Sequence, residues 1–231
     1  NYKPMAADQT RLTLFLADPL PRRNESCCPA MESLLSRADV DGVDESGFHA
    51  RAMRLFGAAI PAEGDLPVAA VTRLADMGVL DREWWLRADP VHLIPERGGL
   101  FLEAGLGLTQ AEASQLVDEL SVVFSDRGWM LRAATPERWY LRPPQPPRIR
   151  TTPLTEATGR DIHAVLPAGI EALAWHSLMN EAQIVLHAST VNATREAQGK
   201  PAANSLWFWG GGSLPGVQPT NWQTVFSNDA F

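Results

Sequence analysis

The sequence is poor in cysteine, and this shortage excludes a disulfide scaffold. Its only two cysteines, Cys27 and Cys28, are adjacent in a chain of 231 residues. Neighbouring cysteines cannot crosslink distant segments without strained geometry, and they lack the CxxC spacing of metal and redox sites. We therefore expect reduced thiols that serve only in packing, which fits a cytoplasmic protein.

Long apolar runs and an excess of basic residues are also missing. No apolar stretch approaches the roughly 20 residues that span a bilayer, and Asn1–Thr10 lacks the basic-then-apolar order of a signal peptide. The net charge of −7 and the pI near 5.2 would repel a phosphate backbone. We expect neither a membrane nor a nucleic acid as partner.

The composition instead favours a folded α/β protein. With 45% hydrophobic residues, the chain can bury a core as one large domain or as two smaller ones. The apolar run Leu12–Ala17 predicts a buried strand that ends at Asp18, where an acid can bind a metal or open a turn. Helices are predicted from Pro29, over Phe48–Phe56 and over Leu66–Met77.

Helix-capping residues and turn glycines indicate where further elements begin and end. Asp65 is a plausible N-cap of the third helix, and Gly78 ends it. The extended pattern from Trp84 to Ile94 and the pair Gly98-Gly99 predict a hairpin. Thr109 and Glu112 form a capping box before a helix over Gln110–Phe124, followed by a hairpin of residues 129–132 and 138–141.

The last third of the sequence predicts two helices and one strand. The proline run Pro143–Pro147 is a stiff connector that marks a boundary. A long helix is expected over Gly169–His187, with Ile170, Leu173 and Ile184 on its apolar face, and a second over Val191–Gln198. Ser205–Trp209 predicts a buried strand that runs into three glycines.

Several segments resemble one known family when they are taken in chain order. They are Leu14–Asp18, Cys28–Leu34, Phe56-Gly57, Trp85–Asp89, Leu108–Ala113 and the stretch from His187 to Pro215. In this order they resemble the archaeal-type cofactor-independent phosphoglycerate mutases of the alkaline phosphatase superfamily. Three further stretches, Trp85–Leu93, Arg138–Leu141 and Trp209–Gly212, are similar to the proteobacterial proteins called RpfE-type regulatory proteins.

The resemblance implies a phosphoryl-transfer site in which a serine attacks phosphate and metals are held by acids and histidines. Counting back from Phe56-Gly57 places the nucleophile near Phe48, which cannot attack phosphate, and Ser46 is the hydroxyl close by. Asp18 is the candidate metal ligand, and Mn²⁺, Mg²⁺ or Zn²⁺ would be the metal of an active protein. We expect the remaining ligands beyond Phe231.

Candidate substrate contacts come from the second half of the chain. The resemblance places His187, Asn192, Arg195 and Asn204 near substrate, whereas such polar clusters more often fix two parts of a protein by satisfying buried backbone groups. Both interpretations stay open.

Two further candidates are a charged pair and a glycine run. Arg87 and Asp89 could bind and orient a phosphate, although alternating charge on a strand more often marks a solvated face. Gly210–Gly212 could cradle a phosphate, but no GK[ST] follows, so a tight turn is favoured.

These patterns predict an α/β fold, namely a partial alkaline-phosphatase-like core interrupted by an α+β insert. Residues 1–80 would open the core, residues 81–204 would form the insert, and residues 205–231 would return to the core and be cut off.

Three hypotheses for function follow. We favour a phosphoglycerate-mutase-like protein without catalysis that acts as a regulatory or metabolite-binding module and recognises a small phosphorylated metabolite. The alternative is a metal-dependent phosphomutase or phosphatase whose site is completed beyond residue 231. The third is a scaffold that self-associates through exposed tryptophans. The sequence leaves the oligomeric state open.

Overall fold

The computed structural model describes residue 13 and residues 29–39, 47–62 and 64–225. The chain falls into two compact units, Asn1–Phe48 and His49–Phe231. In the first unit, helix α1 spans Pro29–Leu35. Pro29 suits the first helical turn because its fixed φ is already helical and its missing N–H would have no partner there. The helix predicted from Pro29 is thus confirmed.

Two helices precede the sheet. Helix α2 spans Phe48–Leu55 and helix α3 spans Val68–Met77, close to the predicted ranges. Helix α3 ends at Gly78, whose φ of 65° lies in the left-handed region that glycine adopts without strain. The predicted cap at Asp65 is wrong: the N-cap position belongs to Pro67, and the Asp65 carboxylate instead accepts hydrogen bonds from Thr151.

The sheet has five strands, all of whose pairings are antiparallel, in the order β2-β1-β4-β3 with β7 on β1. Its strands are β1 (Trp85–Glu96), β2 (Gly99–Glu103), β3 (Met130–Ala133), β4 (Trp139–Arg142) and β7 (Ser205–Gly212). Both predicted hairpins, β1–β2 and β3–β4, are confirmed. The long β1 joins the others, because it pairs with three neighbours along its length.

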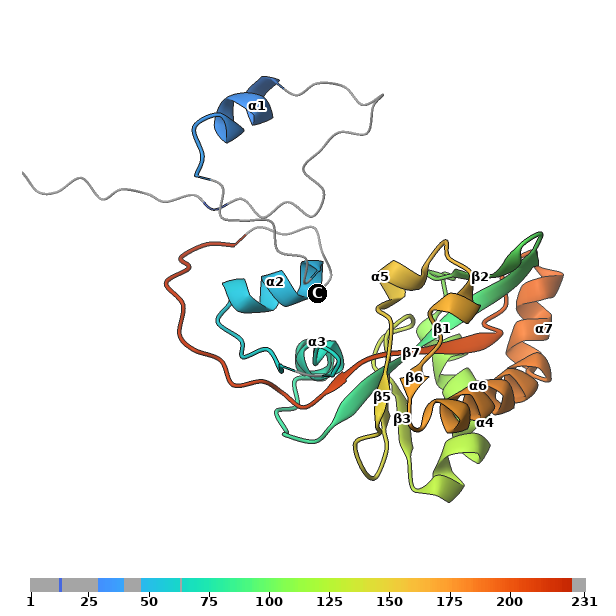
Figure 1. Ribbon diagram of the computed structural model, residues 1–231. Helices are drawn as coiled ribbons and strands as arrows, with labels where there is room; N and C mark the ends of the chain where they lie inside the picture. Colours follow the sequence, from blue (N-terminus) through green and yellow to red (C-terminus); the bar gives the residue numbers. More distant parts are fainter. Residues whose placement is uncertain (1–12, 14–28, 40–46, 63, 226–231) are drawn as a thin grey trace, which may run out of the picture. The chain divides into compact units, whose positions relative to one another are not determined.

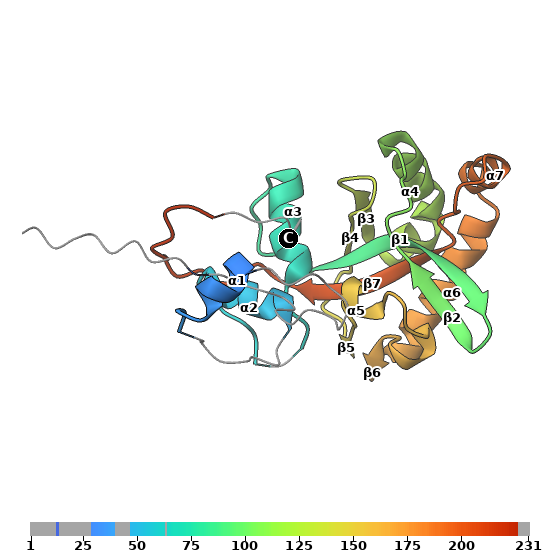
Figure 2. The same cartoon turned by 90° about the horizontal axis from the view of Figure 1, so that it is seen from above.

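Helices and short elements fill the remaining connections. Helix α4 (Gln110–Phe124) carries the predicted capping box and runs into the 3-10 turn η1 (Ser125–Arg127), while α6 (Ala172–His187) and α7 (Thr190–Ala197) follow later. The segment between β4 and α6 contains β5 (Ile149–Arg150), α5 (Leu154–Ala157), the 3-10 turn η2 (Ile162–Ala164) and β6 (Ala168–Gly169). Figure 2 shows α4, α6 and α7 gathered at one end of the sheet, away from α3.

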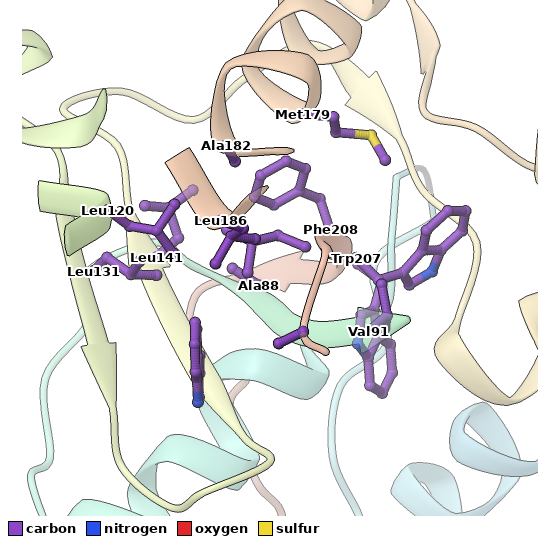
Figure 3. Packing of buried hydrophobic residues seen from close by; sticks show 14 of the residues in the cluster. Ala88, Val91, Leu120, Leu131, Leu141, Met179, Ala182, Leu186, Trp207 and Phe208 are labelled. Atoms are coloured by element: carbon purple, nitrogen blue, oxygen red, sulfur yellow. The ribbon is translucent and has the colours of Figure 1, made fainter. Parts of the chain in front are cut away.

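The core lies between one face of the sheet and helices α4 and α6. Because side chains alternate along a strand, Leu86 and Ala88 of β1 share this face with Phe208 of β7. Leu120 of α4 and Leu186 of α6 pack against them (Figure 3). All five side chains are buried, so this face is the hydrophobic centre of the second unit.

The predicted apolar face of α6 is only partly correct. Trp175, Leu178, Met179, Ala182 and Leu186 are buried, which is the spacing of one helix face. Leu173 and Ile184 are 82% and 72% exposed, and Ile170 before the helix is exposed as well. The sequence pattern could not show that these residues are exposed. Apolar residues occupy a wider arc of the α6 surface than the arc that packs against the core.

The glycine run does not form the turn that we favoured. Gly210–Gly212 continue β7, and a β-bulge shifts the register between the pairs Arg87–Trp209 and Trp85–Gly212. Gly210 has a φ of 67°, which explains a glycine at the irregularity. A Cβ on Gly211 would lie 2.4 Å from the ring of Trp84, so glycine allows a close approach of the backbone to this side chain.

The predicted class is confirmed, since the second unit is a mixed α/β structure with an antiparallel sheet. The division into core and insert stays a prediction. Strand β7, which we assigned to the returning core, pairs with β1 of the expected insert. Within residues 29–39, 47–62 and 64–225, none of the helices combines the length and apolar character that crossing a bilayer requires.

Candidate functional site

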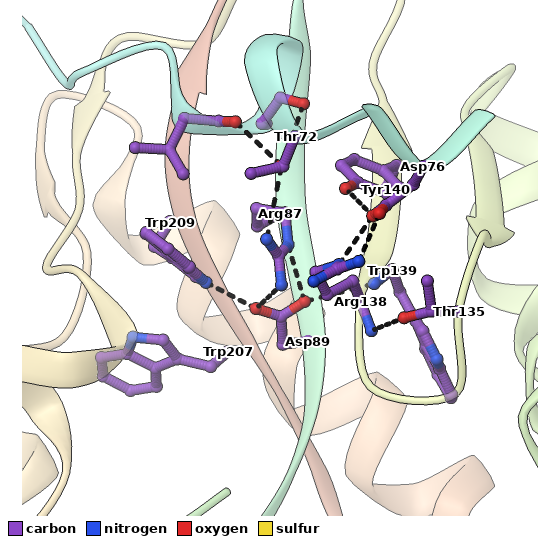
Figure 4. A network of polar contacts seen from close by, with 12 residues as sticks. Thr72, Asp76, Arg87, Asp89, Thr135, Arg138, Trp139, Tyr140, Trp207 and Trp209 are labelled. Carbon is purple, nitrogen blue, oxygen red and sulfur yellow. Dashed lines mark hydrogen bonds and ion pairs between the residues drawn. The ribbon is translucent and has the colours of Figure 1, made fainter. Parts of the chain in front are cut away.

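The face of the sheet opposite the core carries a buried ion pair. Arg87 and Asp89 point from β1 to the α3 side, since they alternate with Leu86 and Ala88. The guanidinium binds the carboxylate through two contacts, Nε to Oδ1 and Nη2 to Oδ2, each 2.9 Å long (Figure 4). Exposed fractions of 5% and 1% overturn the expectation of a solvated face.

Neighbouring strands supply the remaining partners of Asp89. The indole Nε1 of Trp209 donates to its Oδ2 over 2.7 Å, and the backbone N–H of Trp139 donates to Oδ1 over 3.2 Å. Burial raises the pKa of Asp89, and this effect outweighs the attraction of Arg87 and the hydrogen bonds, which lower it. The carboxylate is therefore fully engaged by groups of the protein itself.

Aromatic rings flank the Arg87 guanidinium. In the strand register Arg87 lies opposite Trp209 on one side and Tyr140 on the other. Its guanidinium carbon is 5.2 Å and 5.4 Å from the centres of these rings, distances typical of cation–π contacts. Nη1 also lies 3.4 Å from the hydroxyl of Thr72 on α3. These contacts leave Arg87 enclosed between two strands and a helix.

A second ion pair extends the network at its edge. Arg138 binds Asp76 of α3, with Nε 2.7 Å from Oδ2, and the Tyr140 hydroxyl donates to the same oxygen over 2.5 Å. Burial raises the pKa of Tyr140; the charge of Arg87 opposes this rise and the hydrogen bond to Asp76 adds to it, so the phenol stays protonated and can donate. Helix α3 is thus joined to β4 by charged hydrogen bonds.

The other predicted substrate contacts form a separate cluster around α7. Arg195 is fully buried, and its guanidinium donates to the backbone oxygens of Pro201 and Leu106 and to the carboxylate of Glu112. The respective distances are 3.0, 2.6 and 3.1 Å. Arg195 therefore ties α7 to the start of α4 and to the loop before it.

The two asparagines of this cluster also bind backbone groups. The Asn192 amide donates to the oxygens of Leu186 and Ala203 and accepts from the N–H of Ala203. Asn204 accepts from the N–H of Leu93 and donates to its oxygen, so its side chain continues the pairing of β7 with β1. Both amides satisfy backbone groups that would otherwise be left without partners.

The remaining site candidates lie elsewhere. His187 is exposed in the last turn of α6. The candidate nucleophile Ser46 and the candidate metal ligand Asp18 lie outside the described residues. Among the residues that the structure does describe, no three His, Cys, Asp or Glu side chains gather in a way that could hold a metal. The substrate, catalytic and metal roles of all these residues stay predictions.

Sequence reasoning missed the partners of Arg87 and Asp89. Trp209 and Tyr140 become neighbours of Arg87 only through strand register, and Asp76 approaches Arg138 from 62 positions away. One signal was available: a charged pair on a strand that is apolar on its other face needs partners if that strand lies inside a sheet.

The chain is similar to curated phosphoglycerate mutases over part of its length. It is 41% identical over 68 residues to the 2,3-bisphosphoglycerate-independent phosphoglycerate mutase of Methanosarcina barkeri, a match that covers 29% of this chain and 17% of that protein. It is 32% identical over 111 residues to the 2,3-bisphosphoglycerate-independent phosphoglycerate mutase 2 of Methanothermobacter thermautotrophicus, covering 47% of this chain and 28% of the relative.

A longer match links the chain to a bacterial protein. The probable 2,3-bisphosphoglycerate-independent phosphoglycerate mutase of Geobacter sulfurreducens is 29% identical over 157 residues, which cover 66% of this chain and 38% of the relative. The chain thus spans less than two fifths of these curated relatives. No protein-family model matches it.

One solved structure is also similar, the cofactor-independent phosphoglycerate mutase of Thermoplasma acidophilum. It is 17% identical, with a TM-score of 0.46, and the likeness covers 64% of this chain and 42% of the other. Over the residues that match the curated relatives, this chain is phosphoglycerate-mutase-like.

Proposed function

We propose that this phosphoglycerate-mutase-like protein acts as a regulatory or metabolite-binding module and does not catalyse phosphoryl transfer. One observation supports this most directly. The two arginines that we predicted as substrate contacts, Arg87 and Arg195, are almost completely buried and direct their guanidinium groups at internal partners. A guanidinium that already binds a carboxylate or backbone oxygens must break those bonds before it can bind a transferring phosphoryl group, so the metabolite of this module would be held by other residues.

The finer parts of the proposal come from the sequence resemblance. We assign the chain to the RpfE-type regulatory proteins of bacteria, and we place it in the cytoplasm because its two cysteines are adjacent in sequence, which suits reduced thiols. Its ligand would be a small phosphorylated metabolite. The similarity to phosphoglycerate mutases supports that class of ligand, since a module that loses catalysis can retain recognition.

The test is to measure binding and turnover on the same preparation. Calorimetry would follow 3-phosphoglycerate binding, while mutase and phosphomonoesterase activities would be assayed with Mn²⁺, Mg²⁺ and Zn²⁺. We expect binding without turnover, and Ser46→Ala should leave the binding constant unchanged. Metal-dependent turnover that disappears in Ser46→Ala would contradict the proposal and identify Ser46 as the nucleophile.

The second candidate function is a metal-dependent phosphomutase or phosphatase whose remaining ligands lie beyond residue 231. The curated mutases that match this chain favour it, because the matched region covers only part of each of them. Under this alternative, the longer protein would bind Mn²⁺, Mg²⁺ or Zn²⁺ stoichiometrically and turn over phosphoglycerate. Absence of both from the longer protein would leave the regulatory module.

A further inference from the structure

A cavity of about 400 Å³ lies beside the bulged end of β7, within the second unit. Its size is within the range of small-molecule sites. Its walls are mostly apolar, and those used in the argument are Ile60, Pro61, Pro67, Trp84, Ile149 and Pro215. Of the described residues that line it, Asp65 alone has a charged side chain. The cavity therefore combines an apolar body with one acid.

The acid is held in place by hydrogen bonds. The Thr151 N–H donates to both carboxylate oxygens of Asp65, at 3.0 and 3.2 Å, and the Thr151 hydroxyl donates as well. The backbone N–H of Gly211 also lowers the pKa of this carboxylate, and Arg150 adds a smaller Coulombic attraction. Burial nevertheless raises the pKa of Asp65, because these donors compensate only in part for the water that the carboxylate has lost.

The acid and the indole of Trp84 flank the same glycine. The Gly211 N–H lowers the pKa of Asp65, and a Cβ on Gly211 would lie 2.4 Å from the Trp84 ring. One residue therefore separates the carboxylate from the aromatic wall. Asp65 and Trp84 line the same cavity, and a carboxylate together with an aromatic ring can recognise organic cations by charge and by cation–π attraction.

We propose that this cavity binds an organic ammonium ion, in which an amine is carried on a small apolar body. The ammonium group would lie between Asp65 and Trp84, and the apolar body would contact Ile60, Pro67 and Ile149. The net charge of −7 helps to attract a cation. This inference does not depend on the proposed phosphometabolite function, because it uses none of the side chains predicted to contact substrate, to catalyse or to bind a metal.

The experiment compares three probes of similar shape by calorimetry at neutral pH. They are phenethylammonium, its neutral counterpart 2-phenylethanol and the anion 3-phenylpropionate. We expect phenethylammonium to bind at millimolar concentration or below, the alcohol at least about tenfold more weakly, and the anion not measurably. Absence of binding by phenethylammonium, or equal binding of the alcohol, would overturn the proposal.

Variants then place the probe in the cavity. Asp65→Asn should weaken phenethylammonium about tenfold or more, and Trp84→Leu about two- to fivefold. Asp126→Asn, the same change at an exposed acid of η1, should leave binding unchanged. Ile60→Trp fills the cavity and leaves the acid intact, so it should abolish binding even if Asp65→Asn fails to fold. Unaltered affinity in Ile60→Trp would place the probe elsewhere and refute the site.

Discussion

The two faces of the sheet bury different kinds of side chain: one buries apolar groups, and the other buries an ion pair. On one face, Ala88 lies in the same buried cluster as Leu186 of α6 (Figure 3), and Leu86 belongs to this cluster too. Apolar contacts of this kind do not depend on direction. On the other face, Arg87 and Asp89 of the same strand are equally buried, but each of their polar groups requires a partner (Figure 4). Apolar contacts depend on volume, whereas buried charges depend on particular atoms in particular places.

This difference explains why α3 adjoins the polar face. Thr72 of α3 contacts Arg87. Asp76 of the same helix binds both Arg138 and Tyr140. Helix α3 is therefore held to this face by hydrogen bonds as well as by apolar packing of Ala69 against Trp85 and Tyr140. Substitutions on the two faces should consequently differ in how much they change the unfolding free energy and in whether their effects add.

The largest effect is expected from Asp89→Ala. Removing this carboxylate leaves the Arg87 guanidinium buried without its counter-charge, which costs about 3–5 kcal/mol of unfolding free energy. Urea denaturation would measure the loss. As a control, Asp126→Ala in the exposed η1 turn should change stability by less than about 0.5 kcal/mol. A loss from Asp89→Ala no larger than the control's would contradict the importance of the pair.

The apolar face is tested by two truncations on the same helix. Leu186→Ala removes a fully buried side chain and should cost about 2–5 kcal/mol, because it leaves a cavity against the sheet. Ile184→Ala, two positions away but 72% exposed, should cost less than about 0.5 kcal/mol. Equal losses would mean that α6 presents Ile184 to a partner or packs in another rotation.

A smaller effect is expected at the edge of the polar network. Tyr140→Phe removes the hydroxyl that donates to Asp76 but keeps the ring beside Arg87. We expect a loss of about 1 kcal/mol in unfolding free energy, since Asp76 retains its pairing with Arg138. An unchanged urea midpoint would show that this hydrogen bond contributes nothing beyond the ring's packing.

Acid titration separates a buried carboxylate from an exposed one. The His163 side chain and the Leu100 N–H lower the pKa of Asp161 below 3.8, so its stabilisation is present above pH 3.8 and is lost as the pH falls through the folded value. Burial raises the pKa of Asp89 above 3.8, so the native state gains relative stability as the pH falls from its folded value toward 3.8.

The pKa values of Asp161 and Asp89 are shifted in opposite directions, so their contributions to stability should depend on pH in opposite ways. These are the smallest of the expected effects. Unfolding free energies would be measured from neutral pH down to the acid limit of folding. Relative to Asp161→Asn, the wild type should lose stability below pH 3.8. Relative to Asp89→Asn, it should gain stability above pH 3.8, as the pH is lowered through the raised pKa. The same slope for both comparisons would be inconsistent with these pKa directions.

Local patterns predicted the secondary structure well. The capping box at Thr109 and Glu112, the glycine after α3 and the hairpin at Gly98-Gly99 all lie where the sequence placed them. Each of these signals acts between residues that are close in the chain, so it requires no knowledge of the fold. The exposed Ile184 shows the limit: the covered face of a helix depends on its neighbours.

The candidate site was less predictable for the same reason. The sequence identified Arg87 and Asp89 as a pair, but their burial follows from β7 and β4 on either side of β1. Asp65 was assigned to a helix cap because it precedes α3, whereas its carboxylate binds Thr151, which is 86 positions away. Long-range partners of this kind are invisible to a local pattern.

The most direct test of the central claim is a double-mutant cycle on the buried ion pair. Unfolding free energies would be compared for the wild type, Arg87→Met, Asp89→Leu and the double variant. The account predicts that each single change is costly and that the double variant recovers part of the loss, with a coupling energy of about 2–3 kcal/mol. Additive losses would show that Arg87 and Asp89 stabilise the fold independently, and would contradict the claim that they stabilise it as a buried ion pair.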